Sequence, residues 1–371
     1  MTMNVTDTEV GTLRAGFLGG GFMAAVHSRA VRAAQATPAL IASSRPESSK
    51  TAARALGIAE AASDPSQLIA ADIDVVHVCT PNATHAAYAA AALAAGKHVI
   101  CEKPLATSAD EALALATTAR ESGLVAAVPF VYRYHPQVRE MRARIARGEL
   151  GALLTLDCSY LQDWLLDAGD HDWRVDPALG GSSRAFADIG SHLCDLIEFV
   201  TGERIARLSA RTRTVHEQRA GATVATEDIA ALLVELTGGA LGTVLVSQTA
   251  PGRKNALVLE MHGSLESLRF EQERPEELWV GRRTGSHVLL RDPETAAPDA
   301  ARLSLVPAGH PMGYQDAFNA FVADAYAAAR GARVDGLPTF DDGLRAARLT
   351  EAVLASAASG QWIDVAAEVL A

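Results

Sequence analysis

The amino-acid sequence predicts an α/β protein, with an N-terminal doubly wound parallel sheet and a C-terminal α+β domain that holds a large, mostly antiparallel sheet. Short apolar segments alternate with helical stretches in the first third of the chain, whereas longer strands with few helices between them follow. The chain has 371 residues, more than one hydrophobic core usually holds. We therefore expect two domains, residues 12–130 and residues 131–371.

The first domain is expected to contain a parallel sheet covered by helices on both faces, because its strands and helices alternate. Alanine-rich stretches such as Ala83–Ala95, which Gly96 ends, have the composition of helices. Ser108 and Glu111 have the spacing of a capping box at the start of another helix. The expected strands are Leu13–Leu18, Ala39–Ser43, Val75–Cys79, His98–Cys101 and Val125–Pro129.

The second domain begins with a basic helix, Gln137–Arg147, which Gly148 ends. The stretch Thr237–Ala240 has the composition of a hairpin turn, and strands joined so tightly are antiparallel. We expect residues Arg282–Asp299 to form an exposed loop or irregular edge. The expected strands are Ala152–Tyr160, Arg204–Val215, Ile229–Leu236, Leu241–Thr249 and Ala256–Met261, and helices are expected near Phe186–Val200, Tyr314–Arg330 and Asp341–Ser359.

Composition and charge narrow the possible classes of function. A net charge of −11 does not attract a phosphate backbone, so nucleic acid is not an expected partner. The chain has no apolar run of about 18 residues and no signal peptide, which favours a cytoplasmic protein with no membrane partner and a short disordered N-terminal tail. The cysteines lack CxxC spacing, which favours buried reduced thiols, and no metal-ligand spacing is visible. They are Cys79, Cys101, Cys158 and Cys194.

A glycine-rich turn, Gly16–Ala24, follows the first expected strand and opens a helix. Gly19 permits the tight turn, Gly21 lets the backbone approach a diphosphate, and Ala24 replaces the third glycine of the dinucleotide motif. The free N–H groups and the dipole at the helix N-terminus favour negative charge there. In this strand–turn–helix context, the motif predicts a Rossmann dinucleotide site rather than a turn without a ligand.

The end of the second strand bears on the choice between NAD and NADP. An NAD-selective site usually carries an acidic residue here, which binds the ribose 2′-hydroxyl. This chain has Ser43, Ser44 and Arg45 instead. Two hydroxyls and a guanidinium suit a 2′-phosphate, so the sequence favours NADP. The alternative is an ordinary polar loop with relaxed cofactor choice.

Two further segments carry candidate catalytic residues. Lys103 follows a strand at the edge where open α/β sheets bind ligands, and Pro104 favours an extended backbone at Lys103. Asp188, His192 and Asp195 have the spacing of one helix face, and Asp188 could also be the N-cap of that helix. The ordinary alternatives are a solvated lysine and a buried structural histidine.

These segments resemble the glucose–fructose oxidoreductase / inositol dehydrogenase / MocA (Gfo/Idh/MocA) family. The matching stretches are Gly19–His27, Cys79–His85, Gly96–Pro104 and Asp188–Asp195. The resemblance implies a Rossmann domain followed by a sheet domain that closes over the nicotinamide. It also implies that Lys103, Asp188 and His192 meet at the substrate. With the residues of the turn and of the second strand, the expected cofactor contacts are Gly19, Gly21, Phe22, Met23, Ser43, Ser44, Arg45, Thr80, Pro81, Asn82, His85, Glu102 and Lys103.

A narrower likeness to sugar-oxidising members of this family lies in Tyr160–Trp164, Trp173-Arg174 and Gly309–Tyr314. It implies a dehydrogenase that uses NADP, or NAD, to oxidise a secondary alcohol of a sugar or polyol. Gln162 would bond to hydroxyls, and a tryptophan would form an apolar wall. The expected substrate contacts are Gln162, Trp164, Trp173, Arg174 and Tyr314. Such enzymes can carry an asparagine where this chain has Gly190.

Oxidation of an alcohol requires removal of its proton as the hydride leaves. We expect His192 to be the general base within its ordinary titration range, and Lys103 to stabilise the developing charge on oxygen. Asp188 would orient either group or bind a hydroxyl. In the alternative, the roles are exchanged and neutral Lys103 is the base.

Other functions remain open on the same fold, because a fold alone does not establish a function. They are a keto-sugar or imine reductase in biosynthesis, and a non-catalytic NADP-binding regulatory protein. The expected strands at residues 230–236 and 241–246 carry apolar residues on both faces. Because antiparallel sheets commonly have helices on one face only, we expect a homodimer or homotetramer paired through sheet faces.

Overall fold

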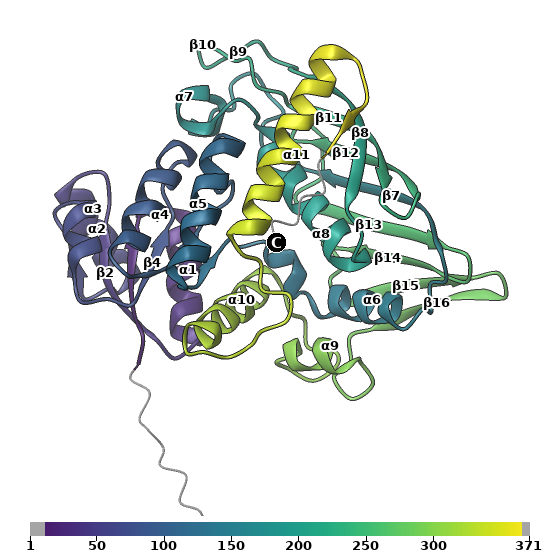
Figure 1. The fold of residues 1–371 in the computed structure, drawn as a ribbon, viewed down its shortest axis with the longest axis horizontal. Helices are drawn as coiled ribbons and strands as arrows, with labels where there is room; N and C mark the ends of the chain where they lie inside the picture. The colour runs from purple at the N-terminus through teal and green to yellow at the C-terminus, as the bar shows by residue number, and fades with distance from the viewer. Residues whose placement is uncertain (1–11, 366–371) are drawn as a thin grey trace, which may run out of the picture.

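A computed structural model describes residues 12–365 of the chain, so the N-terminal tail expected to be disordered lies outside the described residues. Two sheets organise the molecule, with helices α10 (Tyr314–Ala329) and α11 (Phe340–Ser359) between them (Figure 1). The first sheet is parallel throughout and the second is mostly antiparallel, which confirms the predicted fold class.

The N-terminal sheet has the strand order β3-β2-β1-β4-β5-β6. Alternate residues of its strands face two separate cores: Phe17 packs with α1, α2 and α10 on one face, whereas Leu18 packs with α3, α4 and α5 on the other. Strand order reverses between β1 and β4, the position at which open α/β sheets bind ligands. The elements are β1 (Arg14–Leu18), α1 (Phe22–Ala33), β2 (Thr37–Ala42), α2 (Pro46–Leu56), β3 (Glu60–Ala61), α3 (Pro65–Ala70), β4 (Val75–Val78), α4 (His85–Ala94), β5 (His98–Cys101), α5 (Ala109–Ser122) and β6 (Ala126–Ala127).

The second sheet has nine strands in the order β16-β15-β14-β13-β7-β12-β11-β8-β17. Only the central pair, β7 and β12, is parallel. Its strands are β7 (Leu153–Leu161), β8 (Ile205–Arg213), β11 (Ile229–Leu236), β12 (Leu241–Ser247), β13 (Ala256–Gly263), β14 (Ser267–Glu271), β15 (Glu277–Arg282), β16 (Gly285–Leu290) and β17 (Ile363–Asp364), and a small hairpin joins β9 (Gln218–Arg219) to β10 (Ala222–Thr223).

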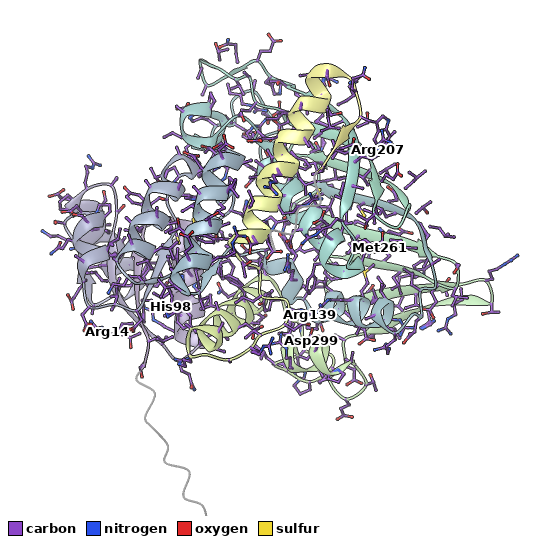
Figure 2. All side chains as sticks on the ribbon, in the orientation of Figure 1. Arg14, His98, Arg139, Arg207, Met261 and Asp299 are labelled. Atoms are coloured by element: carbon purple, nitrogen blue, oxygen red, sulfur yellow. The ribbon has the colours of Figure 1, made fainter. Side chains whose placement is uncertain are left out.

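Helices cover the face of this sheet that is turned toward the first sheet (Figure 1). They are α6 (Pro136–Ala146), α8 (Ser191–Thr201) and α11. A short helix, α9 (Pro298–Leu303), packs on α6, and Figure 2 shows Arg139 beside Asp299 at that contact, with Nη1 and Oδ2 3.0 Å apart. The outer face of the sheet exposes leucines of β11 and β12, namely Leu233, Leu241 and Leu245.

The segment 282–299 differs from the loop or irregular edge that the sequence predicts. Its first part forms β16, a regular edge strand that pairs with β15, and its end begins α9. Every side chain of β16 except Leu289 is exposed. An edge strand exposed on both faces needs no apolar alternation, so the pattern that identifies strands is missing there.

Candidate functional site

A cavity of about 560 Å³ opens at the carboxyl ends of β1, β4 and β5. Its size is typical of a site for a small molecule or cofactor. Most of the residues expected to contact a dinucleotide line it: Gly19, Gly21, Phe22, Met23, Ser43, Ser44, Thr80, Pro81, Asn82, His85, Glu102 and Lys103, joined by Trp173 and Arg174 from the second domain. Cys79 also lines the cavity and is partly exposed, so the expectation of four buried thiols is wrong for this one.

The glycine turn leaves an open cradle at the start of α1. Gly19 has a φ of +99°, and a Cβ there would lie 2.4 Å from the carbonyl oxygen of Cys79, so only glycine fits. At Gly21 an added Cβ would meet nothing within 4 Å. Within residues 12–365 no side chain caps α1, so its first N–H groups stay available. These features fit the diphosphate of a dinucleotide.

The far end of the cavity carries hydroxyls but no carboxylate. Ser43 and Ser44 line it, whereas Arg45 is exposed and does not belong to the lining. The Arg45 guanidinium makes no hydrogen bond or ion pair with the side chains of residues 12–365. A shallower groove beside Ser43 includes Glu47 of α2.

Asn82 and His85 hold the wall of the cavity together. Asn82 donates from Nδ2 to the carbonyl oxygen of Gly180, 2.9 Å away in the second domain. The ring nitrogens of His85 lie 2.7 Å from the carbonyl oxygen of Pro104 and 2.8 Å from that of Thr80. Burial lowers the pKa of His85, and a neutral ring donates to only one of the two carbonyls. The His85 ring therefore lies between the end of β4 and the segment after Lys103 and donates to one of them.

Glu102 begins a buried chain of polar groups that sequence reasoning missed. His27 Nε2 lies 2.9 Å from Glu102, His27 Nδ1 lies 2.8 Å from His77 Nδ1, and His77 Nε2 lies 2.7 Å from the Tyr326 hydroxyl. Burial alone would raise the pKa of Glu102, but the hydrogen bond and charge of His27 outweigh it and lower the pKa. The chain of contacts from Glu102 to Tyr326 gives each ring nitrogen of the two histidines a hydrogen-bond partner.

Lys103 and Asp188 meet at the other end of the cavity. Lys103 Nζ donates to Asp188 Oδ1 at 2.6 Å and to the Asp188 carbonyl oxygen at 2.8 Å, and Arg174 Nε lies 3.6 Å from the same Oδ1. Burial by itself would raise the pKa of Asp188, but the charges of Lys103 and Arg174 outweigh it and hold the pKa well below its usual range. The carboxylate is therefore ionised.

His192 lies at the start of α8, one turn after Asp188. Its ring packs edge-on against Phe130 and Tyr132, with ring centres 5.5 Å and 5.1 Å apart, and its buried Nδ1 has no hydrogen-bond partner among the residues that the structure describes. Burial, and then the charge of Lys103, hold the pKa of His192 well below its usual range. The ring is neutral at neutral pH, so the expected ordinary titration range is wrong.

The helix around Asp188 begins differently from the sequence expectation. Residues Phe186–Gly190 form a π-helical turn, and the N-cap of α8 is Gly190, so Asp188 is not the cap. Asp195 does not join Lys103: its Oδ2 accepts from Arg133 Nε at 2.8 Å. A buried carboxylate needs a nearby cation, and the packing of α8 gives Asp195 a different one.

The expected substrate residues on the large sheet form their own network outside the cavity lining. Trp164 Nε1 donates to Gln162 Oε1 at 2.8 Å, and Gln162 Nε2 donates to Asn255 Oδ1 at 2.9 Å. Asn255 Nδ2 in turn donates to the Tyr132 hydroxyl at 3.1 Å, and Tyr132 also packs against Tyr314, with ring centres 6.3 Å apart. Because Tyr132 touches His192, the network ends beside the candidate base. No sequence motif marks Asn255 or Tyr132.

Neither a candidate metal site nor a membrane-spanning helix is present in residues 12–365. Within that range no group of three or more histidine, cysteine, aspartate or glutamate side chains could hold a metal ion. No helix of the same residues is long and apolar enough to cross a membrane.

The chain matches two family models, and it is similar to known proteins over nearly its whole length. Residues 13–130 match an oxidoreductase family with an NAD-binding Rossmann fold, and residues 138–269 match the GFO/IDH/MocA C-terminal domain. Levoglucosan dehydrogenase of Pseudarthrobacter phenanthrenivorans is 34% identical over 95% of this chain and 98% of its own.

Two solved structures share the fold over 96% of this chain. One is levoglucosan dehydrogenase in complex with NADH and levoglucosan, which is 32% identical, with a TM-score of 0.90 over 100% of its chain. The other is an inositol dehydrogenase homolog from Azotobacter vinelandii in complex with NADH and myo-inositol, which is 30% identical, with a TM-score of 0.86 over 98% of its chain.

Proposed function

The chain belongs to the Gfo/Idh/MocA family of oxidoreductases, and from this premise we propose that it transfers a hydride between a nicotinamide cofactor and a CH–OH carbon of a sugar or polyol. The observation that carries the proposal is the pairing of Lys103, at one end of a cavity whose other parts fit a dinucleotide, with Asp188, which lies one helical turn before His192. We propose residues 12–130 as the cofactor domain and residues 131–371 as the substrate and assembly domain.

The charge states of His192, Lys103 and Asp188 indicate a different role for each side chain in the reaction. The cofactor, when bound, supplies the acceptor for the hydride. Neutral His192 accepts the hydroxyl proton as the general base. Lys103 uses two of its three N–H donors on Asp188 and keeps the third for the substrate oxygen, whose developing charge it stabilises. Ionised Asp188 holds Lys103 in place, which supports this assignment over neutral Lys103 as the base.

The sugar class rests on the relatives and on the side chains around the cluster. The solved structure of levoglucosan dehydrogenase contains levoglucosan, and that of the inositol dehydrogenase homolog contains myo-inositol; both are cyclic polyols. Trp173 would provide an apolar wall, with the Arg174 guanidinium 4.4 Å from its ring centre. On the sheet side, Gln162, Trp164 and Tyr314 would bond or pack against hydroxyl-bearing faces of the substrate.

A turnover assay tests this function directly. Purified protein is incubated with NAD or NADP and a panel of anhydrosugars, pyranoses and inositols, and reduced cofactor is followed by its absorbance. We expect cofactor reduction with at least one cyclic polyol. Tight binding of NADP without turnover on any sugar, in either direction, would favour the non-catalytic alternative.

We further propose that the enzyme prefers NADP to NAD, because Ser43 and Ser44 line the cavity where an acid would select NAD, and the exposed Arg45 follows them in the chain. Arg45→Ala is expected to weaken NADP binding by about tenfold or more, since a charge-assisted bond to the 2′-phosphate is lost. NAD binding should change little. Dissociation constants from fluorescence titration measure both, with Arg54→Ala, exposed on the same helix, as the control. Equal losses for the two cofactors would contradict the preference.

We also propose a homodimer or homotetramer paired through the outer face of the large sheet. The side chains of Leu233, Leu241 and Leu245 are 52%, 56% and 42% exposed there, more apolar surface than a solvated strand face needs. Light scattering at micromolar concentration is expected to give a dimer or tetramer. The double variant Leu233→Glu, Leu245→Glu should dissociate, whereas Leu305→Glu, exposed away from the sheet, should not. A wild-type monomer would refute this assembly.

A further inference from the structure

Asp188 is held through both of its carboxylate oxygens, from opposite sides of the site. Lys103, after β5, donates to Oδ1. Gln248, which follows β12 in the large sheet, donates from Nε2 to Oδ2 at 2.7 Å. The Gln248 side chain is completely buried, and its backbone N–H donates to the Asp228 carbonyl oxygen at 3.0 Å. One oxygen of the Asp188 carboxylate therefore accepts from a residue of the first sheet's edge, and the other accepts from a residue that follows a strand of the second sheet.

The orientation of the Gln248 amide is fixed by charge at both ends. Its Oε1 accepts from Arg184 Nη1 at 3.0 Å, while its NH₂ group faces the Asp188 carboxylate. A flipped amide would place its NH₂ against the guanidinium and its oxygen against the carboxylate, and both contacts would be repulsive. Gln248 can thus offer Asp188 only a donor.

Arg184 is itself immobilised. It is fully buried, and its Nη2 bonds to Asp228, which also accepts from Arg219 Nη2 at 2.7 Å. Burial alone would raise the pKa of Asp228, but the Val215 N–H and the Arg184 charge outweigh it and lower the pKa. These side chains form a chain of hydrogen bonds in which the charges alternate on either side of the neutral Gln248 amide. In order, they are Arg219, Asp228, Arg184, Gln248, Asp188 and Lys103. No member can rotate without leaving a buried polar group unpaired.

We propose that Gln248 is a positioning residue, oriented by Arg184 and Asp228, which turns Oδ1 of Asp188 toward Lys103. The inference rests on the proposed function, in which Lys103 and Asp188 belong to the reacting cluster. Its consequence is geometric: without the Gln248 donor, the carboxylate rotates, and the third N–H of Lys103 is no longer aimed at the substrate oxygen. Misplacement by about 1 Å can cost roughly a hundredfold in rate.

The first test replaces Gln248 by leucine and needs no substrate. In the cofactor-free protein, brief treatment with acetic anhydride followed by mass spectrometry gives the acetylation rate of Lys103. We expect Gln248→Leu to raise this rate several-fold, because Nζ loses a fixed partner. The control is Gln137→Leu on α6, a buried glutamine that donates to the carbonyl oxygens of Glu276 and Leu289, so both variants lose two side-chain hydrogen bonds.

The second test uses Gln248→Glu and the pH dependence of turnover. A protonated carboxyl copies the amide, with an O–H for Asp188 and a carbonyl for Arg184, whereas an ionised one repels Asp188. The ratio of variant to wild-type kcat should therefore fall by tenfold or more as pH rises, while the Kd for NADPH stays unchanged. The other titratable groups around Asp188 are shared by both proteins: Lys103, Arg174, His192, Tyr132, Tyr160 and Tyr314.

A merely structural role for Gln248 makes different predictions in both tests. The ratio of kcat values would be independent of pH, and Lys103 would be acetylated at the same rate in Gln248→Leu as in Gln137→Leu. Either result overturns the positioning role. If the wild type turns over no sugar, the proposed function fails, but the acetylation rates still decide whether Gln248 positions Asp188.

Discussion

Replacement of His192 by alanine is expected to lower turnover by about 10²- to 10⁴-fold, the usual contribution of general base catalysis. The ring is buried and neutral and lies one helical turn after Asp188, so the variant removes the acceptor for the hydroxyl proton. The Kd for NADP should be nearly unchanged, because His192 is not among the residues that line the dinucleotide cavity. Steady-state rates on the best sugar and a cofactor titration measure the two effects.

The pH profile adds an independent check on His192. A histidine whose pKa is lowered is in its base form at neutral pH and becomes protonated only in acid. We therefore expect kcat/KM to be level through the ordinary titration range of histidine, to fall only at more acid pH, and to lose this acid limb in His192→Ala. The control is His98→Ala, at the opposite end of β5, where the ring accepts from the Val125 N–H. Near-normal turnover of His192→Ala would show that His192 is a packed core histidine.

Replacement of Lys103 by methionine is expected to lower kcat by about 10²- to 10³-fold, the cost of losing one donor to a developing oxyanion. Methionine keeps much of the length of the side chain but leaves Asp188 with Arg174 as its nearest cation, 3.6 Å away. Because Lys103 also lines the cavity, cofactor binding should weaken as well. Rates and dissociation constants are measured on the same preparation.

The double variant Lys103→Met, His192→Ala tests whether the two residues act together. Residues that act as a unit lose little more together than in the worse single variant. We therefore expect the double variant to be close to that single variant. A loss equal to the product of the two separate losses would show that Lys103 and His192 act in independent steps.

The sequence by itself was sufficient to predict the glycine turn at the start of α1, because consecutive residues build it. Gly19 must be glycine for a local reason, its left-handed φ and its contact with the end of β4, and that requirement is visible as a motif. The same holds for the Ser108 cap of α5, whose hydroxyl accepts from the Glu111 N–H as the spacing predicts. Such features depend on backbone angles and periodicity, which a short stretch of sequence specifies.

Residues far apart in sequence were predicted to meet only where the family resemblance linked them. Lys103 and Asp188 are 85 positions apart and form the expected pair. Arg45 was placed at the cofactor by its position after the second strand, but its side chain is exposed and lies outside the cavity lining. Asp195 shares a helix with His192, yet its partner is Arg133 because the packing of α8 directs it there.

Only the tertiary structure could bring Gln248, Asn255 and the His27–His77 pair into the account. Gln248 reaches Asp188 because β12 lies beside β7 and ends at the site, and Asn255 reaches Tyr132 because β13 pairs with β7 in one register. Likewise, α10 returns from the far end of the chain to pack on α1, which brings Tyr326 to His77. Local sequence specifies which segments are strands and helices. The contacts between side chains depend on strand order, register and helix packing, which are settled by burial of the whole core.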